Sequence, residues 1–220
     1  IRPLGMPGET PAPALTDGFH LVIEALKLNG IDTIFGLPGI PITDLTRKAQ
    51  AAGIRVISFR HEQQAAHAAD AYYRVTHKLA VLNVHLSPGL TNALTGVASA
   101  AADSTPMGVF TGNTPSYHHA REPHQGIRLH ADASQGDIYR PICKRVWRVD
   151  DAKYLVDVMP RALNLAQAGR PGAVLIDIPM DVFSQHIDAP AQEMSSRRAN
   201  YSRPAAAADA GRTRRARRAG

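Results

Sequence analysis

Cysteine is nearly absent from this sequence, which has Cys143 alone among its 220 residues. One cysteine excludes an internal disulfide framework, and this fits a protein of the reducing cytoplasm. No apolar run is long enough to cross a membrane, and no signal-peptide pattern opens the chain. We therefore expect a cytoplasmic protein that is not embedded in a membrane.

Acidic residues are scarce in the last thirty positions. Residues 191–220 hold eight Arg against Glu193 and Asp209, and this excess accounts for the whole net charge of +6. Of the 25 basic and 19 acidic side chains in the chain, 17 of each lie in the first 190 residues. The folded part is therefore neutral, and nucleic acid is not an expected partner of it. A weaker alternative makes the Arg-rich tail itself a binder of nucleic acid or another anionic surface.

Composition divides the chain into three parts. Residues 1–15 are rich in Pro and Gly and are expected to form a flexible N-terminal arm. Residues 16–188, with regular hydrophobic patterning, are predicted to form one domain. Residues 189–220, with runs of Ala and Arg, are expected to be a disordered basic tail of low complexity.

Within residues 16–188, short apolar runs alternate with amphipathic segments. This alternation is typical of a parallel sheet covered by helices. The predicted class is α/β, an open doubly wound, mostly parallel six-stranded sheet with helices on both faces. The expected strands are 32–35, 54–59, 79–84, 107–111, 145–149 and 173–178, and the expected helices are about 17–29, 42–51, 61–76, 91–102 and 151–168.

Glu62 stands on the first turn of the predicted helix 61–76, directly after a strand expected to be buried. A carboxylate is favoured there by the helix dipole, and ligand sites of α/β proteins lie beyond the carboxyl ends of parallel strands. The simpler alternative is a helix-start charge that faces water. Considered alone, Glu62 fits that alternative better.

Four turns follow the carboxyl ends of predicted strands and would line one crevice. They supply small residues, a carboxylate and a histidine, and they span residues 36–39, 60–62, 85–89 and 112–114. No phosphate-binding glycine motif and no Cys-based metal spacing is present. From the residues alone, the sequence predicts a small-molecule cleft with one candidate acid.

An ordered set of motifs resembles the pyrimidine-binding domain of thiamine-diphosphate-dependent enzymes, in particular the acetolactate synthase, oxalyl-CoA decarboxylase and benzoylformate decarboxylase group. The similarity runs from about Thr16 to Phe183. Its main motifs are Phe35-Gly36-Leu37-Pro38-Gly39, Arg60-His61-Glu62-Gln63, Ser87-Pro88-Gly89-Leu90-Thr91-Asn92, Asp103-Ser104-Thr105-Pro106 and Gly169-Arg170-Pro171-Gly172. Ala71 and Leu86 depart from the usual pattern of this group, so the resemblance predicts no single substrate.

The resemblance implies that Glu62 is catalytic. In this family such a carboxylate bonds the aminopyrimidine ring of thiamine diphosphate and favours the imino form that activates the cofactor. Leu37, Pro38 and Gly39 match a turn that packs on that ring, and Pro88 and Asn92 match a helix start that contacts it. The plainer alternatives are a turn that shapes a strand end and a polar helix residue without a ligand.

Two further residues are carried over by the resemblance. His85 matches a histidine of the benzoylformate decarboxylase-like enzymes and would be catalytic as a proton relay, against the alternative of a strand-end histidine bonded to backbone. Gln125 resembles a glutamine that reaches the cofactor in some synthases. A second register through residues 130–132 is open for that glutamine.

The other histidines and the cysteine give no site. His118, His119, His124 and His130 share one loop, but their spacing is not that of a zinc site, so no metal ligand is predicted on this chain. Cys143 is expected to be a thiol at the edge of the core without a catalytic role.

The family's diphosphate-binding domain carries a Gly-Asp-Gly motif that holds Mg²⁺, and this sequence has no such motif. The resemblance therefore implies that this chain holds half of a cofactor site and is inactive alone. The complete enzyme would be a lyase or carboligase acting on 2-oxo acids or on 2-hydroxyacyl or oxalyl-type substrates. A diphosphate-binding domain or partner subunit, in a homo- or hetero-oligomer, would complete it. FAD is expected only if a central domain exists.

Three origins remain open for such a chain: a subunit of a split enzyme, a fragment, or a reading frame that runs into an Arg/Ala tail. The alternative function is a non-catalytic remnant or binding domain that keeps the fold.

Overall fold

The computed structural model describes residues 15–119, 121–123, 125–127 and 133–188. The predicted tail and all of the predicted arm except Leu15 lie outside these ranges. Among the described helices, none is long and apolar enough to span a membrane.

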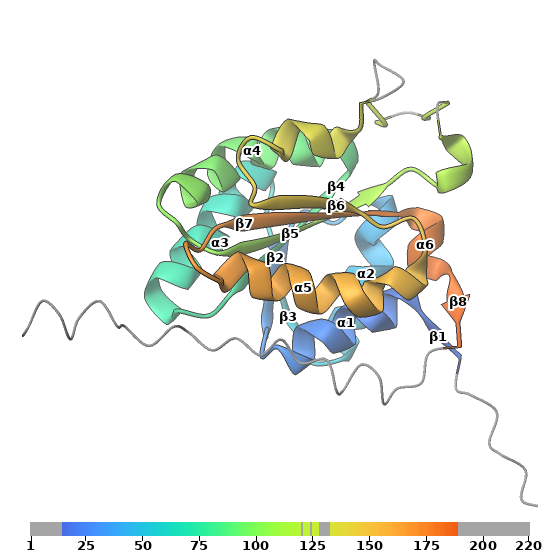
Figure 1. Cartoon of the computed structure of the whole chain (residues 1–220), viewed down its shortest axis with the longest axis horizontal. Helices are drawn as coiled ribbons and strands as arrows, with labels where there is room; N and C mark the ends of the chain where they lie inside the picture. Colours follow the sequence, from blue (N-terminus) through green and yellow to red (C-terminus); the bar gives the residue numbers. More distant parts are fainter. Residues whose placement is uncertain (1–14, 120, 124, 128–132, 189–220) are drawn as a thin grey trace, which may run out of the picture.

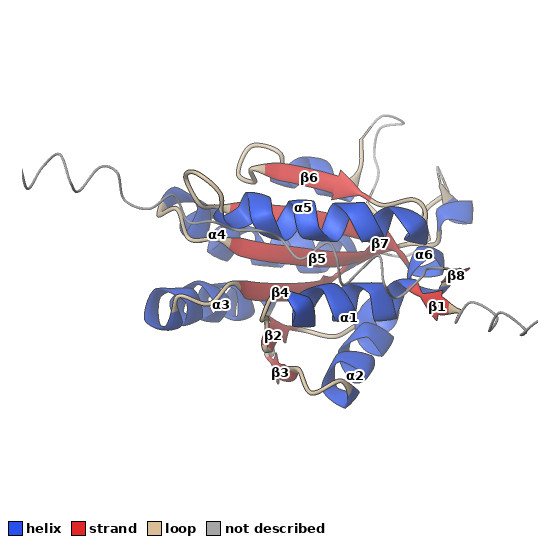
Figure 2. Cartoon of the chain, turned by 60° about the horizontal axis from the view of Figure 1, so that its bottom comes forward, coloured by secondary structure: helices blue, strands red, loops and turns tan. Residues whose placement is uncertain are grey.

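Six parallel strands form the central sheet, in the spatial order β3-β2-β4-β5-β7-β6 (Figure 2). Their bounds are β2 Thr33–Gly36, β3 Arg55–Ser58, β4 Ala80–His85, β5 Met107–Asn113, β6 Arg145–Arg148 and β7 Ala173–Pro179. All residues of β5 and β7 are buried, as expected for central strands covered on both faces.

Helices cover both faces of this sheet (Figure 1). One face packs against α1 (Gly18–Leu28), α2 (Thr43–Ala51) and α5 (Leu155–Gln167), and the other against α3 (Glu62–Thr76) and α4 (Leu86–Ala102). The prediction of an α/β fold with a six-stranded parallel sheet and two helical layers is confirmed.

A second, two-stranded sheet joins the start of the domain to its end. β1 (Thr16–Asp17) pairs antiparallel with β8 (His186–Ile187), which follows the short helix α6 (Met180–Ser184). Asp17 also caps α1, because its side chain accepts a hydrogen bond from the His20 N–H at 2.8 Å. This two-stranded sheet was not predicted, since strands of two residues show no hydrophobic periodicity.

Two predicted elements are corrected by the structure. The strand 54–59 was expected to be buried, but β3 is an edge strand whose side chains are half-buried or exposed. The helix expected at 91–102 begins five residues earlier, at Leu86, so residues 86–89 are its first turn. Proline is tolerated in a first turn because the N–H that it lacks has no intrahelical partner, and this explains the error at Pro88.

Short helical turns between the main elements were not predicted. Four 3-10 helices occur within the described residues. The first of them continues directly into α2, and the predicted helix 42–51 therefore agrees with α2 to within one residue. The four 3-10 helices are Ile40–Ile42, Ser116–His118, Gln135–Tyr139 and Ala152–Tyr154.

Candidate active site

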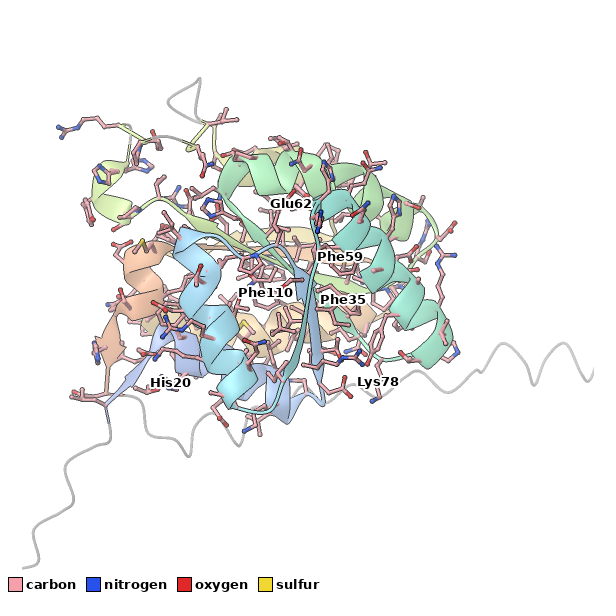
Figure 3. The ribbon with its side chains drawn as sticks, turned by 180° about the vertical axis from the view of Figure 1, so that it is seen from behind. His20, Phe35, Phe59, Glu62, Lys78 and Phe110 are labelled. Carbon is pink, nitrogen blue, oxygen red and sulfur yellow. The ribbon has the colours of Figure 1, made fainter. Side chains whose placement is uncertain are left out.

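Glu62 is the first residue of α3, at the carboxyl end of the sheet (Figure 3). The preceding His61 caps the helix, because its ring Nδ1 accepts a hydrogen bond from the Gln63 N–H at 3.2 Å. Only 6% of the surface of Glu62 is exposed. The alternative of a helix-start charge facing water is therefore wrong.

One carboxylate oxygen of Glu62 is paired and the other is open. Asn92 on α4 donates from its side-chain amide to Oε2 at 3.0 Å. The second oxygen, Oε1, has no hydrogen bond or cation partner within the described part of the chain, and a Cβ built at Gly89 would lie 3.5 Å from it. Among the described residues, the fully buried side-chain atoms without a partner are Asn83 Oδ1 and His85 Nδ1, so Oε1 of Glu62 keeps some accessible surface.

A second cluster forms around His85, the last residue of β4. Its ring Nε2 lies 2.7 Å from Oε1 of Gln125. Gly39, which follows β2, lies against the other side of the ring: a Cβ at that position would approach the ring atoms to 2.2–2.6 Å. The structure thus brings three of the predicted site residues together, from three separate segments.

The remaining predicted residues frame these clusters. The Leu37 N–H donates to the Asn83 carbonyl at 3.3 Å, which ties the turn after β2 to β4. Pro38 is exposed, and Pro88 is half-buried in the first turn of α4. The alternative register for the glutamine, through His130, Ala131 and Asp132, lies outside the described residues.

The loop that carries Gln125 is anchored by residues to which sequence reasoning gave no role. Ser87 is fully buried; its Oγ accepts from the Ile127 N–H at 3.0 Å and donates to Gln135 Oε1 at 3.0 Å. Gln135 in turn donates to the Gly112 carbonyl at 3.0 Å. These bonds join the start of α4, the loop and β5. The only sequence signal for them was that Ser87 belongs to the motif Ser87-Pro88-Gly89-Leu90-Thr91-Asn92.

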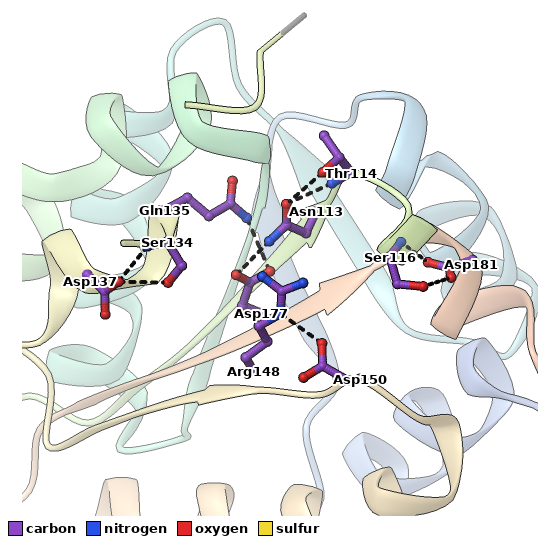
Figure 4. A network of polar contacts seen from close by, with 10 residues as sticks. All are labelled: Asn113, Thr114, Ser116, Ser134, Gln135, Asp137, Arg148, Asp150, Asp177 and Asp181. Carbon is purple, nitrogen blue, oxygen red and sulfur yellow. Dashed lines mark hydrogen bonds and ion pairs between the residues drawn. The ribbon is translucent and has the colours of Figure 1, made fainter. Parts of the chain in front are cut away.

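Asp177 near the end of β7 closes this network (Figure 4). It accepts hydrogen bonds from the Asn113 amide at 2.9 Å and the Gln135 amide at 3.1 Å. Burial raises the pKa of the Asp177 carboxyl to about 7, against the opposing effects of Arg148 and of the two amide donors.

The other candidate groups give no site. Burial raises the pKa of the Cys143 thiol to about 12, so this thiol stays protonated near neutrality. In the described ranges, no three His, Cys, Asp or Glu side chains gather as a metal site. His124 and His130 lie outside those ranges.

Ligand sites of α/β proteins lie at the carboxyl edge of the parallel sheet, and here that edge carries the buried, half-open carboxylate of Glu62 as a candidate group. The sequence model described as "Thiamine pyrophosphate enzyme, N-terminal TPP binding domain" matches residues 16–134. The chain belongs to this family of thiamine-pyrophosphate-binding domains.

Curated relatives agree with this assignment. Oxalyl-CoA decarboxylase of Escherichia coli (strain K12) is 38% identical over 178 residues, which cover 77% of this chain and 29% of that protein. The acetolactate synthase large subunit of Parasynechococcus marenigrum (strain WH8102) is 40% identical over 181 residues, covering 80% and 28%. Acetolactate synthase of Arthrospira platensis is 40% identical over 189 residues, covering 84% and 32%. The chain thus spans about a third of the length of these relatives.

Proposed function

We propose that this chain supplies the pyrimidine-binding half of a thiamine-diphosphate site, with Glu62 as the residue that activates the aminopyrimidine. The open oxygen of the buried Glu62 carboxylate carries the proposal. An acceptor of this kind suits a ring N–H donor, because a charge-assisted hydrogen bond is stronger than a neutral one. Asn92, by holding the other oxygen, fixes the direction in which the carboxylate faces.

The other predicted residues fit around such a ring. The turn of Leu37, Pro38 and Gly39 would pack against it, and Pro88 and Asn92 would border it from the first turns of α4. Thiamine diphosphate, when bound, supplies a carbon nucleophile and an electron sink for cleaving or forming a bond next to a carbonyl group. His85 and Gln125, joined at 2.7 Å, would offer a proton relay and an amide to the reacting oxygen atoms.

The proposed whole activity is that of a lyase or carboligase, by decarboxylation or by formation or cleavage of a C–C bond. The proposed substrate classes are 2-oxo acids and 2-hydroxyacyl or oxalyl-type substrates, and the name of the relative oxalyl-CoA decarboxylase supports the oxalyl type. The diphosphate and Mg²⁺ would be held by a further domain or a partner subunit, in a homo- or hetero-oligomer. FAD would bind only if a central domain accompanies this one.

Exposed apolar side chains favour such a partner. Ile40, which follows the turn after β2, and Tyr117, which follows β5, are 78% and 72% exposed. Met180, directly after β7, is 40% exposed. All three follow carboxyl ends of strands, where a docked domain would close the half-site.

The test is a titration of the 220-residue chain with thiamine diphosphate, followed by NMR. We expect weak binding with amide shifts at Leu37, Gly39 and Asn92. Glu62→Gln should weaken binding about tenfold, because a neutral amide replaces the charged acceptor. In an enzyme assembled with a diphosphate-binding partner, the same variant should slow exchange of the cofactor C2 proton by orders of magnitude.

Glu24→Gln is the matched control, since Glu24 is an exposed carboxylate on α1, which covers the opposite face of the sheet from α3 and α4. It should leave binding unchanged. If thiamine diphosphate shifted none of the amide signals of Leu37, Gly39 and Asn92, the proposed half-site would be contradicted. Wild-type C2 exchange in the assembled Glu62→Gln enzyme would contradict the role of Glu62, and binding without any C2 exchange in the assembled wild type would indicate a non-catalytic domain.

A further inference from the structure

The His85 ring is held on two opposite sides. Its Nδ1 is buried and has no hydrogen-bond partner among the described residues. Gly39 faces that side of the ring: a Cβ there would come within 2.5 Å of Nδ1. The other ring nitrogen, Nε2, meets the side chain of Gln125.

The partner of Nε2 fixes the position of the ring proton. The Gln125 atom at 2.7 Å is the amide oxygen, which can only accept a hydrogen bond. With the Gln125 amide in this orientation, Nε2 carries the proton and donates it, and the neutral ring has its lone pair on Nδ1. Beside Gly39, none of the residues that the structure describes offers Nδ1 an acceptor that would favour a proton there instead.

Two residues in contact with His85 have a strained, left-handed backbone. Four described non-glycine residues have a positive φ, and two of these, His77 and Ser104, follow the ends of helices, where this conformation is common. The other two are Leu86, next to His85 in the chain with φ +50°, and Gln125, bonded to the ring, with φ +75°. Such residues persist where surrounding contacts hold them, and they gather at functional sites.

The contact that holds Gln125 comes from the same helix start. Ile127, two residues later, donates its N–H to Oγ of the buried Ser87, which follows His85 by two residues. The strand end that positions the imidazole therefore also positions the amide that bonds to it. Among the described residues, the amide nitrogen of Gln125 has no acceptor, and it carries two N–H donors.

We infer that Gln125 is a positioning residue for His85: its amide oxygen holds the imidazole as the Nε2–H tautomer, and its amide nitrogen offers donors to a carbonyl or carboxylate oxygen of the substrate. The second half of this statement rests on the proposed function. The first half is a property of the chain itself. It makes His85, in this state, a donor at Nε2 and a bare nitrogen at Nδ1.

The experiment is a long-range ¹H–¹⁵N correlation of the histidine rings in the 220-residue chain, with His85 assigned by the signals missing in His85→Gln. We expect the shift of a protonated nitrogen at Nε2, that of a bare nitrogen at Nδ1, and a visible Nε2–H proton. Gln125→Ala should speed solvent exchange of that proton about fivefold or more, the effect of losing one ordinary hydrogen bond. Gln125→Glu keeps an oxygen acceptor and should keep the tautomer.

Arg121→Ala, an exposed residue of the same loop, is the control and should leave the His85 signals unchanged. A proton on Nδ1 in the wild type, or no change in Gln125→Ala with the fold intact, would overturn the inference. Because these signals need no cofactor, failure of the chain to bind thiamine diphosphate would refute the proposed function and leave this result standing. For the second half, Gln125→Ala should raise KM for a 2-oxo acid in an assembled enzyme more than Arg121→Ala does; an equal KM would refute it.

Discussion

A carboxylate can be buried without a counter-ion only if its surroundings supply hydrogen bonds, and the site around Glu62 supplies one. Asn92 satisfies one oxygen, and the N-terminal position on α3 adds the favourable end of the helix dipole. Sequence reasoning found this acid because a strand end followed by a helix start is a local pattern. The burial of Glu62 could not be predicted from its own segment, because the residues beside its carboxylate, Asn92 and Gly89, belong to α4.

The position of the His85 ring depends on the absence of a side chain at Gly39. Gly39→Ala would place a methyl group 2.2–2.6 Å from the ring atoms, so the ring must leave its present position between Gly39 and Gln125. We expect a loss of about 1–3 kcal/mol in the free energy of unfolding, as for other overpacked sites. Denaturant unfolding measures this loss, and the exchange rate of the His85 Nε2–H proton reports the displaced ring.

Gly172→Ala is the control for this substitution. A Cβ there meets only carbons of the flexible Lys144 side chain, at 3.2 and 3.3 Å, which can shift at small cost. Equal stability losses for the two variants would show that the contact between Gly39 and His85 has no special effect.

Other residues of the site were beyond sequence reasoning. Ser87, Gln135 and Asp177 are far apart in the chain, and their polar side chains become partners only when β5, β7 and α4 are packed together. A buried Asp177 in an apolar strand is visible in the sequence, but the two amides that donate to it are not. Local patterns identify a polar residue, whereas its partners depend on the tertiary fold.

At the scale of elements, α3 and α4 approach each other unusually closely. Their contact surface is built from small residues, including Ala65, Ala66 and Ala69 on α3 and Ala93 and Gly96 on α4. A Cβ at Gly96 would lie 2.5 Å from the Cβ of Ala66 and 3.2 Å from the Gln63 carbonyl oxygen. This close packing places α3 against α4, and therefore Glu62 beside Asn92.

Gly96→Ala tests this packing against intrinsic helix propensity. Alanine in a helix interior is favoured over glycine by about 1 kcal/mol, so an isolated helix would gain stability. We expect the protein to lose about 1–3 kcal/mol instead, because backbone and Cβ atoms of α3 cannot move away cheaply. Thermal or denaturant unfolding decides between the two signs.

Thr95→Ala, at the exposed neighbouring position of α4, serves as the comparison and should change stability little. A stabilised Gly96→Ala protein would mean that the two helices are free to separate. In that case the distance between Glu62 and Asn92 would not be set by their packing.

The type and order of the main elements could be predicted because their hydrophobic periods are strong. Their boundaries were less accurate where a helix follows a strand without a loop. β4 ends at His85 and α4 begins at Leu86, whose left-handed backbone makes the change of direction in a single residue. A sequence of Ser, Pro and Gly at this point is typical of a turn, so the first turn of the helix was assigned to a loop.

For the whole molecule, Asp177 makes stability depend on pH. Its carboxyl titrates near 7 in the folded protein and near 3.8 as a free group, so the folded state binds more protons between these values. A raised pKa of this kind stabilises the folded state below about pH 4, and the contribution is lost as the pH rises through 7. The integrated effect is on the order of a few kcal/mol.

Asp177→Asn removes this titration while keeping the size of the side chain. The difference in unfolding free energy between wild type and variant should therefore fall as the pH is raised from about 4 to about 8, because the wild type alone acquires a buried charge. Denaturant unfolding at several pH values measures the difference. A constant difference, or one that rises with pH, would contradict the assigned pKa.

The ribbon of β1 and β8 has a consequence for how this domain can be connected. Thr16 and Ile187 are paired neighbours, and Cα atoms paired across antiparallel strands lie only about 5 Å apart. A few glycines would bridge that gap, and new ends could be opened at the exposed bend between α5 and β7. The order of the elements along the chain would then change, while every strand kept its neighbours in the sheet. Both new ends would lie at the same bend, so the permuted domain could be inserted into a surface loop of a host protein.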